Sequence, residues 1–581
     1  MSYKIGFAGT DGRTLLSAIV VATAKSQSGN DDFHGVVIRG TPAMPEFAKI
    51  MNWPISFIPT TDNSVASYAT AIVAALKKGV IDCVIPMPED LLYQGLVDEI
   101  AKAGFGNQIA GFSKNGTFME SDKITCKKLC RDFGVPVADA WREVDARNYS
   151  EVLRTILEMI DNYGGAVIKY PYSAGGKGSH IILDTWQIKE VYDILMAKYT
   201  KKTEDGKDYV SICGNNAWPL LIESRMSGAE ISFTVLVDKN GNFQILPTAM
   251  DYPERFAGPA SKDNPITGGM ASLSPHPMDS VELTEMARKQ IIEPFIAAMR
   301  AKNILRSCVL YPGCIISFDS QMRPRRIRMC EMNIRPGEPE FQPVVKRLRN
   351  LGHLVKAMFD GNLNEIVPEV RQNQISISIP LVIGKGGPSG QKGYPWSYAK
   401  GELVEIDFKH FAKNKIQLIP SGMGYDEKGN VFKSEGTRIV YMDINGTIKP
   451  GETMADVAKR LREKLLSAFD RGKIRVIPRE NPKGNRLDLR RDVGEHYLIA
   501  EKTFLTRGTN MNIFTTLKSA VGKKVTIAYS VEKPITEGSL SKEKQIAEGM
   551  LTEFDEIQYE AELDNCFRIG TQVIDTVTVL S

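Results

Sequence analysis

The sequence predicts a multidomain chain of α/β and α+β architecture, with a parallel-sheet α/β domain at the N-terminus and β-rich parts towards the C-terminus. Three observations favour this class. The chain has 581 residues, enough for about four domains of ordinary size. Its 43% hydrophobic and 24% charged residues match a globular protein better than a disordered or fibrous one. Short strand-like runs also alternate with helical periodicities near the N-terminus.

The charge balance and the cysteine pattern argue against several classes of partner. Lys and Arg number 73 against 69 Asp and Glu, a net charge of +4 that does not by itself indicate a nucleic-acid partner. The sequence shows no apolar stretch of about 18 residues and no signal-peptide pattern, so we expect neither a membrane span nor secretion. Eight scattered cysteines without a CxxC pair favour a reducing cytoplasm over a disulfide framework or a structural zinc site.

The first predicted domain covers residues 1–112. A strand from Lys4 to Ala8 meets a turn at residues 9–13, after which apolar residues recur at helical spacing. Further strands are expected at 35–38, 55–58 and 80–86, with a helix at 64–77. Gly9 and Gly12 form no full dinucleotide fingerprint, so a tight strand-to-helix connection explains them at least as well as a phosphate site.

The second predicted domain covers residues 113–350 and includes a small lid at about 125–225. Strands are expected at 166–170, 180–183, 220–223, 231–237 and 243–247, with a hairpin turn at Asn240-Gly241. Residues 173–178, Ser-Ala-Gly-Gly-Lys-Gly, join two of these strands. Their glycines, with Lys169 and Lys177, suit a cover over a phosphate, although the loop is not a Walker A motif and, taken alone, fits a plain surface turn better.

Residues 327–335 alternate with period two. This pattern puts Glu331, Asn333 and Arg335 on one face and Cys330, Met332 and Ile334 on the other. The two oxygen-bearing side chains suit Mg²⁺ that also binds nucleotide phosphates, and Arg335 suits a carboxylate or phosphate. An ordinary amphipathic strand is the alternative, but the acidic turn at 336–340 favours function. The glycine loop at 264–270 is either a ligand-admitting loop or a simple connection.

The remaining chain divides into two parts. Residues 351–494 predict a third domain, with strands at 375–383 and 438–444 and a helix at 454–469. Residues 495–581 predict an extra small β-rich module, for which we expect an interaction or oligomerisation role ahead of nucleic-acid binding.

Seven motifs occur in one order along residues 1 to about 494. They are 87–92 with 95–98, 120–123, 174–178, Glu223 with 227–232, 267–270, 331–340 and 490–494. Each is weak alone, but in this order they resemble the phosphoribosylamine-glycine ligase family, which belongs to the ATP-grasp superfamily. The resemblance implies an ATP-grasp core, and an enzyme that uses ATP to join glycine to phosphoribosylamine through an acyl phosphate.

The resemblance also implies ATP and Mg²⁺ (or Mn²⁺) as cofactors, and it assigns site residues. ATP would be held by Lys123, Lys169, Gly175, Gly176, Lys177, Gly178, Glu223 and Glu230. Glu331 and Asn333 would hold the metal. Arg335, Glu338, Thr267, Gly268 and Gly269 would form the catalytic, substrate-side part. Gly12, Arg13, Pro88, Glu89 and Asp90 would bind the phosphorylated substrate, with Glu223 and Glu230 at the adenine and ribose end of ATP.

Three departures from the family pattern bear on the substrate. The family's Gly-Gly-Arg-Glu-His-Ala turn is Asp-Gly-Arg-Thr-Leu-Leu at 11–16, which keeps Arg13 but lacks the Glu and the His. The Asp-His-Lys-Arg stretch is altered at 251–255, and the Asp of a Gly-Asp-Pro-Glu turn is Glu338. Two alternatives therefore stay open: an ATP-grasp ligase for another acid and amine, and a nucleotide-binding regulatory or assembly protein without catalysis.

Overall fold

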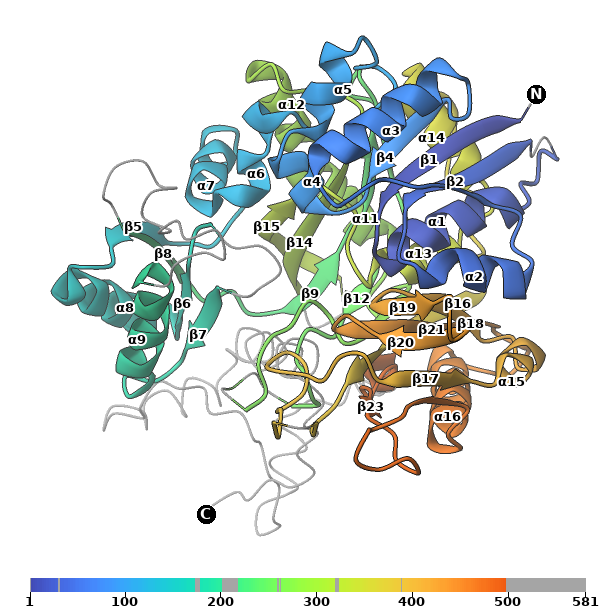
Figure 1. Cartoon of the computed structure of the whole chain (residues 1–581). Coiled ribbons are helices and arrows are strands. Elements are labelled where there is room, and N and C mark those ends of the chain that lie inside the picture. Colours follow the sequence, from blue (N-terminus) through green and yellow to red (C-terminus); the bar gives the residue numbers. More distant parts are fainter. Residues whose placement is uncertain are drawn as a thin grey trace.

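A computed structural model gives the fold of this protein (Figure 1) and describes residues 2–29, 32–172, 178–200, 218–258, 261, 263–318, 323–387 and 389–497. The predicted ATP contacts Gly175, Gly176 and Lys177 lie outside the described residues, as does nearly all of the predicted module at 495–581. Within the described part of the chain, no helix combines the length and the apolar character needed to cross a membrane.

A four-stranded parallel sheet opens the chain, as the alternation of strands and helices predicted. Its order is β3-β2-β1-β4, so the order reverses between β1 and β4. The strands are β1 (Tyr3–Gly9), β2 (Phe33–Arg39), β3 (Ser56–Ile58) and β4 (Cys83–Pro86). The helices are α1 (Gly12–Thr23), α2 (Ala43–Met51), α3 (Val65–Lys77), α4 (Glu89–Tyr93) and α5 (Leu96–Lys102). In such sheets, ligands bind where the order reverses, outside the carboxyl ends of the strands.

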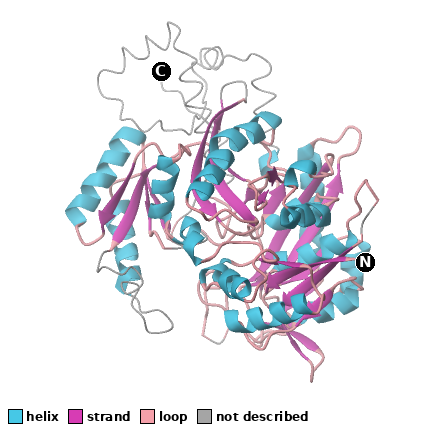
Figure 2. Ribbon diagram, turned by 90° about the horizontal axis from the view of Figure 1, so that it is seen from above, coloured by secondary structure: helices cyan, strands magenta, loops and turns pink. Residues whose placement is uncertain are grey.

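A separate antiparallel sheet of order β5-β8-β6-β7 lies within the range of the predicted lid, and both views show it set apart from the other sheets (Figures 1 and 2); we call this sheet and its helices the lid unit. It has its own core, around Ile156, Ile168 and Ile222. Short helices lead into it: η1 (Lys114–Gly116), α6 (Phe118–Ser121) and α7 (Lys123–Asp132). Its elements are β5 (Trp141–Asp145), α8 (Tyr149–Tyr163), β6 (Ala166–Lys169), β7 (Ser179–Ile182), α9 (Gln187–Thr200) and β8 (Pro219–Ser224).

A five-stranded sheet follows, built on the long hairpin β14–β15. The strands are β9 (Ala229–Ser232), β10 (Val235–Val237), β11 (Phe243–Ile245), β14 (Cys308–Phe318) and β15 (Pro324–Asn333). The single strand predicted at 231–237 is wrong: β9 and β10 both pair with β14, on either side of a break at Phe233 and Thr234. The predicted hairpin at Asn240-Gly241 joins β10 to β11. Also in this region lie α11 (Val281–Ala287), the π-helix η2 (Arg288–Ile292) and α12 (Glu293–Ala301).

Two further sheets complete the described chain. One has the order β12-β13-β16-β21-β18, with β23 on β16, and the other the order β19-β20-β17-β22. The first contains β12 (Met250–Asp251), β13 (Ser272–Ser274), β16 (Gln374–Ile383), β21 (Arg438–Thr447), β18 (Gln417–Pro420) and β23 (Leu487–Asp488). The second contains β17 (Leu403–Ile406), β19 (Met423–Asp426), β20 (Val431–Ser434) and β22 (Ile474–Val476). The accompanying helices are α13 (Phe341–Lys346), α14 (Leu351–Asp360), η3 (Leu363–Glu365), α15 (Phe408–Lys413) and α16 (Met454–Asp470).

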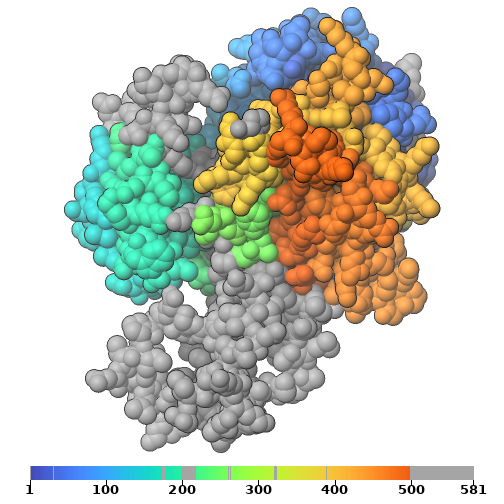
Figure 3. All heavy atoms as spheres, turned by 60° about the horizontal axis from the view of Figure 1, so that its bottom comes forward, coloured from blue at the N-terminus to red at the C-terminus, as the bar shows by residue number. Residues whose placement is uncertain are grey.

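The first of these sheets joins residues that are far apart in the sequence. β13 pairs with β16, so strands from both sides of residue 350 share one sheet. In the space-filling view, the teal lid unit and the orange residues after 400 lie on opposite sides of the visible face (Figure 3). The division into domains at 112, 350 and 494 stays a prediction.

Candidate active site

A buried carboxylate between two lysines connects the lid unit to α7. Glu223 on β8 is 1% exposed, and its two oxygens lie 2.5 Å from the ammonium groups of Lys127 and Lys169. Burial raises the pKa of Glu223, but the two lysines outweigh it and lower the pKa to about 2. The predicted ATP residues Glu223 and Lys169 are therefore joined directly. The sequence patterns did not indicate Lys127 as a site residue, although it lies one helical turn from Lys123.

A small cavity of about 10 Å³ brings three predicted residues together. Lys123 comes from α7, and Glu331 and Asn333 come from the end of β15. The full lining is Met119, Glu120, Lys123, Cys126, Lys127, Met329, Cys330, Glu331, Met332 and Asn333. Lys169 is also close, because its ammonium group donates to the carbonyl oxygen of Cys330 at 3.3 Å. Two lysines, Lys123 and Lys127, and two carboxylates, Glu120 and Glu331, thus line one small space, with Lys169 beside it.

The charges in this cavity act on one another. Burial raises the pKa of Glu331, but Lys123 and Lys169 together bring it below its ordinary value, so the carboxylate is charged. Burial lowers the pKa of Lys123 despite the nearby Glu331 carboxylate, and Lys169 adds to the lowering. The Asn333 amide donates to the Glu331 carboxylate at 3.3 Å and to the Tyr311 carbonyl at 3.2 Å. This side chain is thereby held beside the carboxylate.

The period-two alternation predicted for residues 327–335 is interrupted. Gly313 on β14 lies opposite Glu331, whereas the next residue, Cys314, lies opposite Met329. Cys330 is therefore the extra residue of a β-bulge, which re-aims the side chains that follow it. The strand also ends at Asn333, so Arg335 belongs to the following loop rather than to the strand face.

Arg335 connects that loop to the parallel sheet. Its Nε lies 3.1 Å from a carboxylate oxygen of Glu89 at the start of α4 and 3.4 Å from Glu120. Burial lowers the pKa of Arg335, but Glu120 and Glu89 raise it well above its ordinary value. For Glu120, burial dominates and raises the pKa to about 7, although Arg335 opposes the shift. The second oxygen of Glu120 accepts from the Ile334 amide at 2.9 Å.

The predicted substrate residues Gly12, Arg13, Pro88, Glu89 and Asp90 all lie just beyond the carboxyl ends of β1 and β4, where the strand order reverses. The start of α1, however, already carries carboxylates. Asp11 accepts from the Thr14 amide at 2.9 Å, and Glu338 accepts from the Gly12 amide at 3.1 Å. Arg13 is 3% exposed; its guanidinium donates to Asp11 at 3.1 Å and to the carbonyl oxygen of Pro336.

A third group of residues contacts the loop at 267–269 or lies beside it. The sequence motifs indicated only some members of this group. The Gly268 amide donates to the Tyr394 hydroxyl oxygen at 3.4 Å, and the Thr267 hydroxyl donates to the Pro253 carbonyl at 2.8 Å. Arg438 donates to Tyr441 at 3.2 Å, and Tyr441 donates to Glu338 at 2.8 Å. Tyr394, Arg438 and Tyr441 follow residue 350 and lie in no motif that the sequence analysis identified.

Glu230 on β9 acts on different neighbours from Glu223. Burial raises the pKa of Asp251 well above its usual range, and the charges of Glu340 and Glu230 add to the shift.

Gly178 is the one predicted ATP contact of the glycine loop that the structure describes. Its carbonyl oxygen accepts from the Tyr170 amide at 2.8 Å, where β6 and β7 meet the loop.

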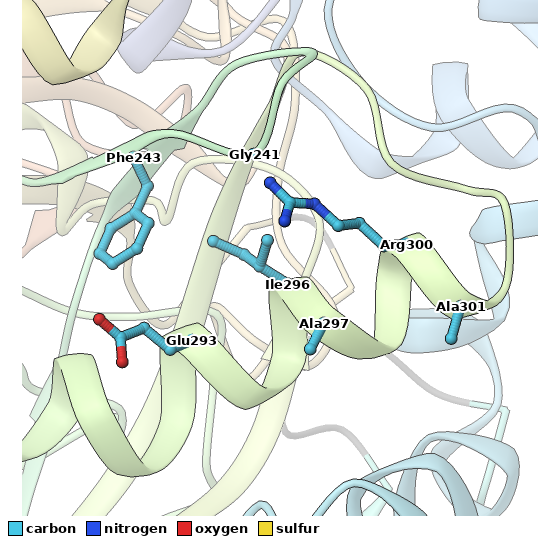
Figure 4. Close-up of a pocket in the computed structure, with 7 residues that line it drawn as sticks. All are labelled: Gly241, Phe243, Glu293, Ile296, Ala297, Arg300 and Ala301. Carbon is cyan, nitrogen blue, oxygen red and sulfur yellow. The ribbon is translucent and has the colours of Figure 1, made fainter.

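A larger hollow lies away from all of these residues (Figure 4). It has a volume of about 590 Å³ and lies between the β10–β11 turn and α12. Its lining is Gly241, Phe243, Glu293, Ile296, Ala297, Arg300 and Ala301. None of the predicted site residues is among them.

Comparison with known proteins gives one family match. Residues 121–341 match the family described as phosphoribosylglycinamide synthetase, ATP-grasp (A) domain. A phosphoribosylamine–glycine ligase of Caldanaerobacter subterraneus is 28% identical over 378 residues, which are 63% of this chain and 81% of that protein. Its namesake in Vibrio cholerae is 27% identical over 372 residues, 64% of this chain and 77% of that protein.

Solved structures share the fold. A phosphoribosylamine–glycine ligase from Thermotoga maritima superposes with a TM-score of 0.57 at 18% identity, covering 84% of this chain and 99% of that one. A biotin carboxylase complex with β-γ-ATP from Campylobacter jejuni gives 0.50 at 13% identity, over 80% of this chain and 91% of that one. At these identities the likeness concerns the fold alone.

Proposed function

We propose that this chain, whose residues 121–341 match the ATP-grasp (A) domain of phosphoribosylglycinamide synthetase, is an ATP-dependent ligase that joins glycine to phosphoribosylamine. The products are glycinamide ribonucleotide, ADP and phosphate, a step of purine synthesis. The observation that carries the proposal is the small cavity in which Lys123, Glu331 and Asn333 meet, with Lys169 beside it. Lys123 comes from one motif and the Glu331–Asn333 pair from another, and Lys169 comes from a predicted strand, so cations for ATP phosphates and oxygen ligands for a metal meet in one place.

The two lysines supply the charge for the nucleotide. Lys123 and Lys169 would neutralise the ATP phosphates, and the glycine loop at 175–178 would close over them. Lys169 is paired with Glu223 in this structure. ATP binding would therefore exchange one anionic partner of this lysine for another, while Lys127 keeps Glu223 paired.

Glu331 and Asn333 fit a divalent cation. Mg²⁺ prefers oxygen ligands, and this pair offers a charged carboxylate and an amide oxygen next to the expected phosphates. Mg²⁺ or Mn²⁺ held there would stabilise the negative charge that develops on the phosphates during transfer.

The reaction has two steps. The glycine carboxylate attacks the γ-phosphorus of ATP, and ADP leaves, which gives an acyl phosphate. The amine of phosphoribosylamine then attacks the acyl carbon, phosphate leaves and one proton is lost. Arg335, Glu338 and residues 267–269 would line the substrate side, where buried charge would stabilise the transition states.

The proposal is tested by ADP release from the purified full-length chain. We expect release that requires glycine and phosphoribosylamine together, and a product with the mass of glycinamide ribonucleotide. ADP release that ignores either substrate would contradict the assignment. The absence of any turnover would instead favour the nucleotide-binding regulatory or assembly protein.

One observation favours a second candidate function, a ligase of the same type that uses another amine. Asp11 and Glu338 place two carboxylates at the start of α1, where a substrate phosphate would otherwise accept backbone hydrogen bonds. A side-chain carbon on Gly12 would also collide with the ring of Tyr441. Assay of non-phosphorylated primary amines with glycine and ATP distinguishes the two: faster turnover with one of them than with phosphoribosylamine would establish this alternative.

A further inference from the structure

Two buried lysines are held between the same two strands. Lys127 on α7 and Lys169 on β6 each lie 2.5 Å from one oxygen of the Glu223 carboxylate on β8. On the other side, Lys127 donates to the carbonyl oxygen of Met329 at 3.4 Å, and Lys169 donates to that of Cys330 at 3.3 Å. Both ammonium groups therefore connect β8 to consecutive residues of β15.

The charges of these three side chains do not cancel. Two ammonium groups face one carboxylate, and the side chains of Lys127, Lys169 and Glu223 are only 5%, 9% and 1% exposed. Water screens charges poorly in such a place, so an excess positive charge acts strongly on a nearby anion. Without Lys127, the carboxylate and Lys169 would form a neutral pair, and no excess cation would remain there for a phosphate.

The two lysines come from different kinds of element. Lys127 lies inside α7, where helical hydrogen bonds hold its backbone on both sides. Lys169 is the last residue of β6, the strand that leads into the predicted glycine loop at 173–178. Lys127 is therefore the better placed to keep Glu223, and Lys169 is the better placed to turn towards a phosphate.

We propose that Lys127 is a positioning residue for ATP, which holds Glu223 so that Lys169 is left to bind a phosphate oxygen. This assignment rests on the proposed function, in which Lys169 contacts the ATP phosphates. Lys127 also lines the small cavity. Its role nevertheless acts through Glu223, because its ammonium group stays on the carboxylate when the nucleotide binds.

The test is a double-mutant cycle in the full-length chain. Equilibrium dialysis with radiolabelled ligands gives the Kd for ATP with Mg²⁺ and the Kd for adenosine, which has the same base and sugar without the phosphates. The variants are Lys127→Met, Glu223→Gln and the two combined. Lys128→Met is the matched control, because this neighbouring lysine pairs with Glu143 on the surface.

Lys127→Met should raise the Kd for ATP at least about 10-fold, the effect of losing one charge-assisted contact, and change the Kd for adenosine by less than about threefold. In the Glu223→Gln background the same substitution should change neither Kd by more than about threefold, because no carboxylate is left to claim Lys169. Lys128→Met should match the parent.

Three results would overturn the assignment. One is a Kd for ATP that Lys127→Met leaves unchanged, and another is an equal loss of affinity for ATP and adenosine, which a merely structural role would give. The third is an undiminished loss of ATP affinity when Lys127→Met is made in the Glu223→Gln background, because Lys127 would then contact the nucleotide itself. A parent chain that binds no ATP would instead contradict the proposed function.

Discussion

Glu331 shows how a single carboxylate is kept charged in a buried place. Lys123 and Lys169 bring its pKa below the ordinary value despite burial, and Asn333 donates to it. Glu331→Gln keeps the size of the side chain and removes the charge. We expect kcat for ATP-dependent turnover to fall at least about 100-fold, since a lost metal ligand costs several kcal/mol in the transition state.

Stopped assays of ADP release measure this change, with denaturant unfolding as the check on folding. Glu143→Gln is the control, because Glu143 is half exposed and paired with Lys128 on the surface. Activity of Glu331→Gln within about tenfold of the parent would remove this carboxylate from the metal site.

Lys127 and Lys128 are neighbours in the sequence with opposite environments. Lys127 is 4% exposed and pairs with the buried Glu223, whereas Lys128 pairs with Glu143 in solvent. Lys127→Met should lower the free energy of unfolding by about 3 kcal/mol, because it removes one of the two lysines paired with the buried Glu223 carboxylate. Lys128→Met should change it by less than about 1 kcal/mol. Equal effects in urea titrations would show that the buried pair contributes no more than the surface pair.

The contribution of Glu120 to the free energy of unfolding depends on pH. Its pKa is about 7 in the folded protein, above the value of about 4.3 expected in the unfolded chain, so the folded state binds the proton more tightly. The stability that Glu120 contributes is therefore full below about pH 4 and is lost as pH rises towards 7. As pH rises from about 4 to 7, the unfolding free energy of the parent should fall relative to that of Glu120→Gln. A pH-independent difference would contradict the raised pKa.

Among the helices and strands, periodicity predicted those whose formation depends on local sequence. The alternation in residues 4–86 predicted the parallel sheet with α1 and α3, but not α2, and the apolar spacing after Met454 predicted α16. The failures have a shared cause. The break between β9 and β10 and the bulge at Cys330 both depend on how these segments pair with β14. The partner strand lies about 80 residues away in the chain in one case and across a hairpin in the other. Its effect on the segment is therefore not visible in the periodicity of the segment's own sequence.

The start of α1 is tied to the loop after β15 by Arg13. The buried guanidinium donates to Asp11 and to the Pro336 carbonyl, and it lies 3.9 Å from Glu89. Arg13→Ala should therefore raise KM for the phosphorylated amine more than KM for ATP. It should also lower the free energy of unfolding by about 2 kcal/mol, since Asp11 and Pro336 lose their donor.

Steady-state kinetics and urea unfolding check both effects. Arg142→Ala, which removes a half-exposed partner of Glu158, is the matched control and should change neither quantity. Equal effects of Arg13→Ala on KM for both substrates would remove Arg13 from the substrate side.

For the whole molecule, the described chain continues three residues past the predicted boundary at Gly494. His496 and Tyr497 are 1% and 2% exposed. The Tyr252 hydroxyl contacts His496 at 2.9 Å, and the Tyr497 hydroxyl donates to the Pro275 carbonyl. A chain of residues 1–497 should keep the parent's turnover per molecule. A chain of residues 1–494 should lose about 3–5 kcal/mol of unfolding free energy, the usual cost of removing a buried aromatic side chain.

Kinetics and thermal unfolding of the two truncated chains provide the measurement. Equal stability of both would show that these aromatic contacts contribute nothing. A folded 1–497 chain without turnover would mean that the residues beyond 497 complete the active site.

The site as a whole was only partly predictable. The ordered motifs identified Lys123, Glu331 and Asn333, which the fold brings into one cavity, because these residues sit in recognisable local patterns. Lys127 left a weak signal, its spacing of four from Lys123. Tyr394 and Arg438 left none, since the first lies in a connecting loop and the second is a single charged residue at the start of a strand. The pairing of β13 with β16 carries these later residues to the loop at 267–269.

We propose that this chain activates a carboxylate as an acyl phosphate and passes it to an amine. This proposal is tested most directly with glycine labelled with ¹⁸O in its carboxylate, in a reaction with ATP, Mg²⁺ and phosphoribosylamine, followed by mass spectrometry of the inorganic phosphate. One glycine oxygen should appear in phosphate for each ADP formed, because that oxygen bridges carbon and phosphorus in the intermediate and leaves with phosphorus. Product formation with unlabelled phosphate, or phosphate release without product, would contradict the account.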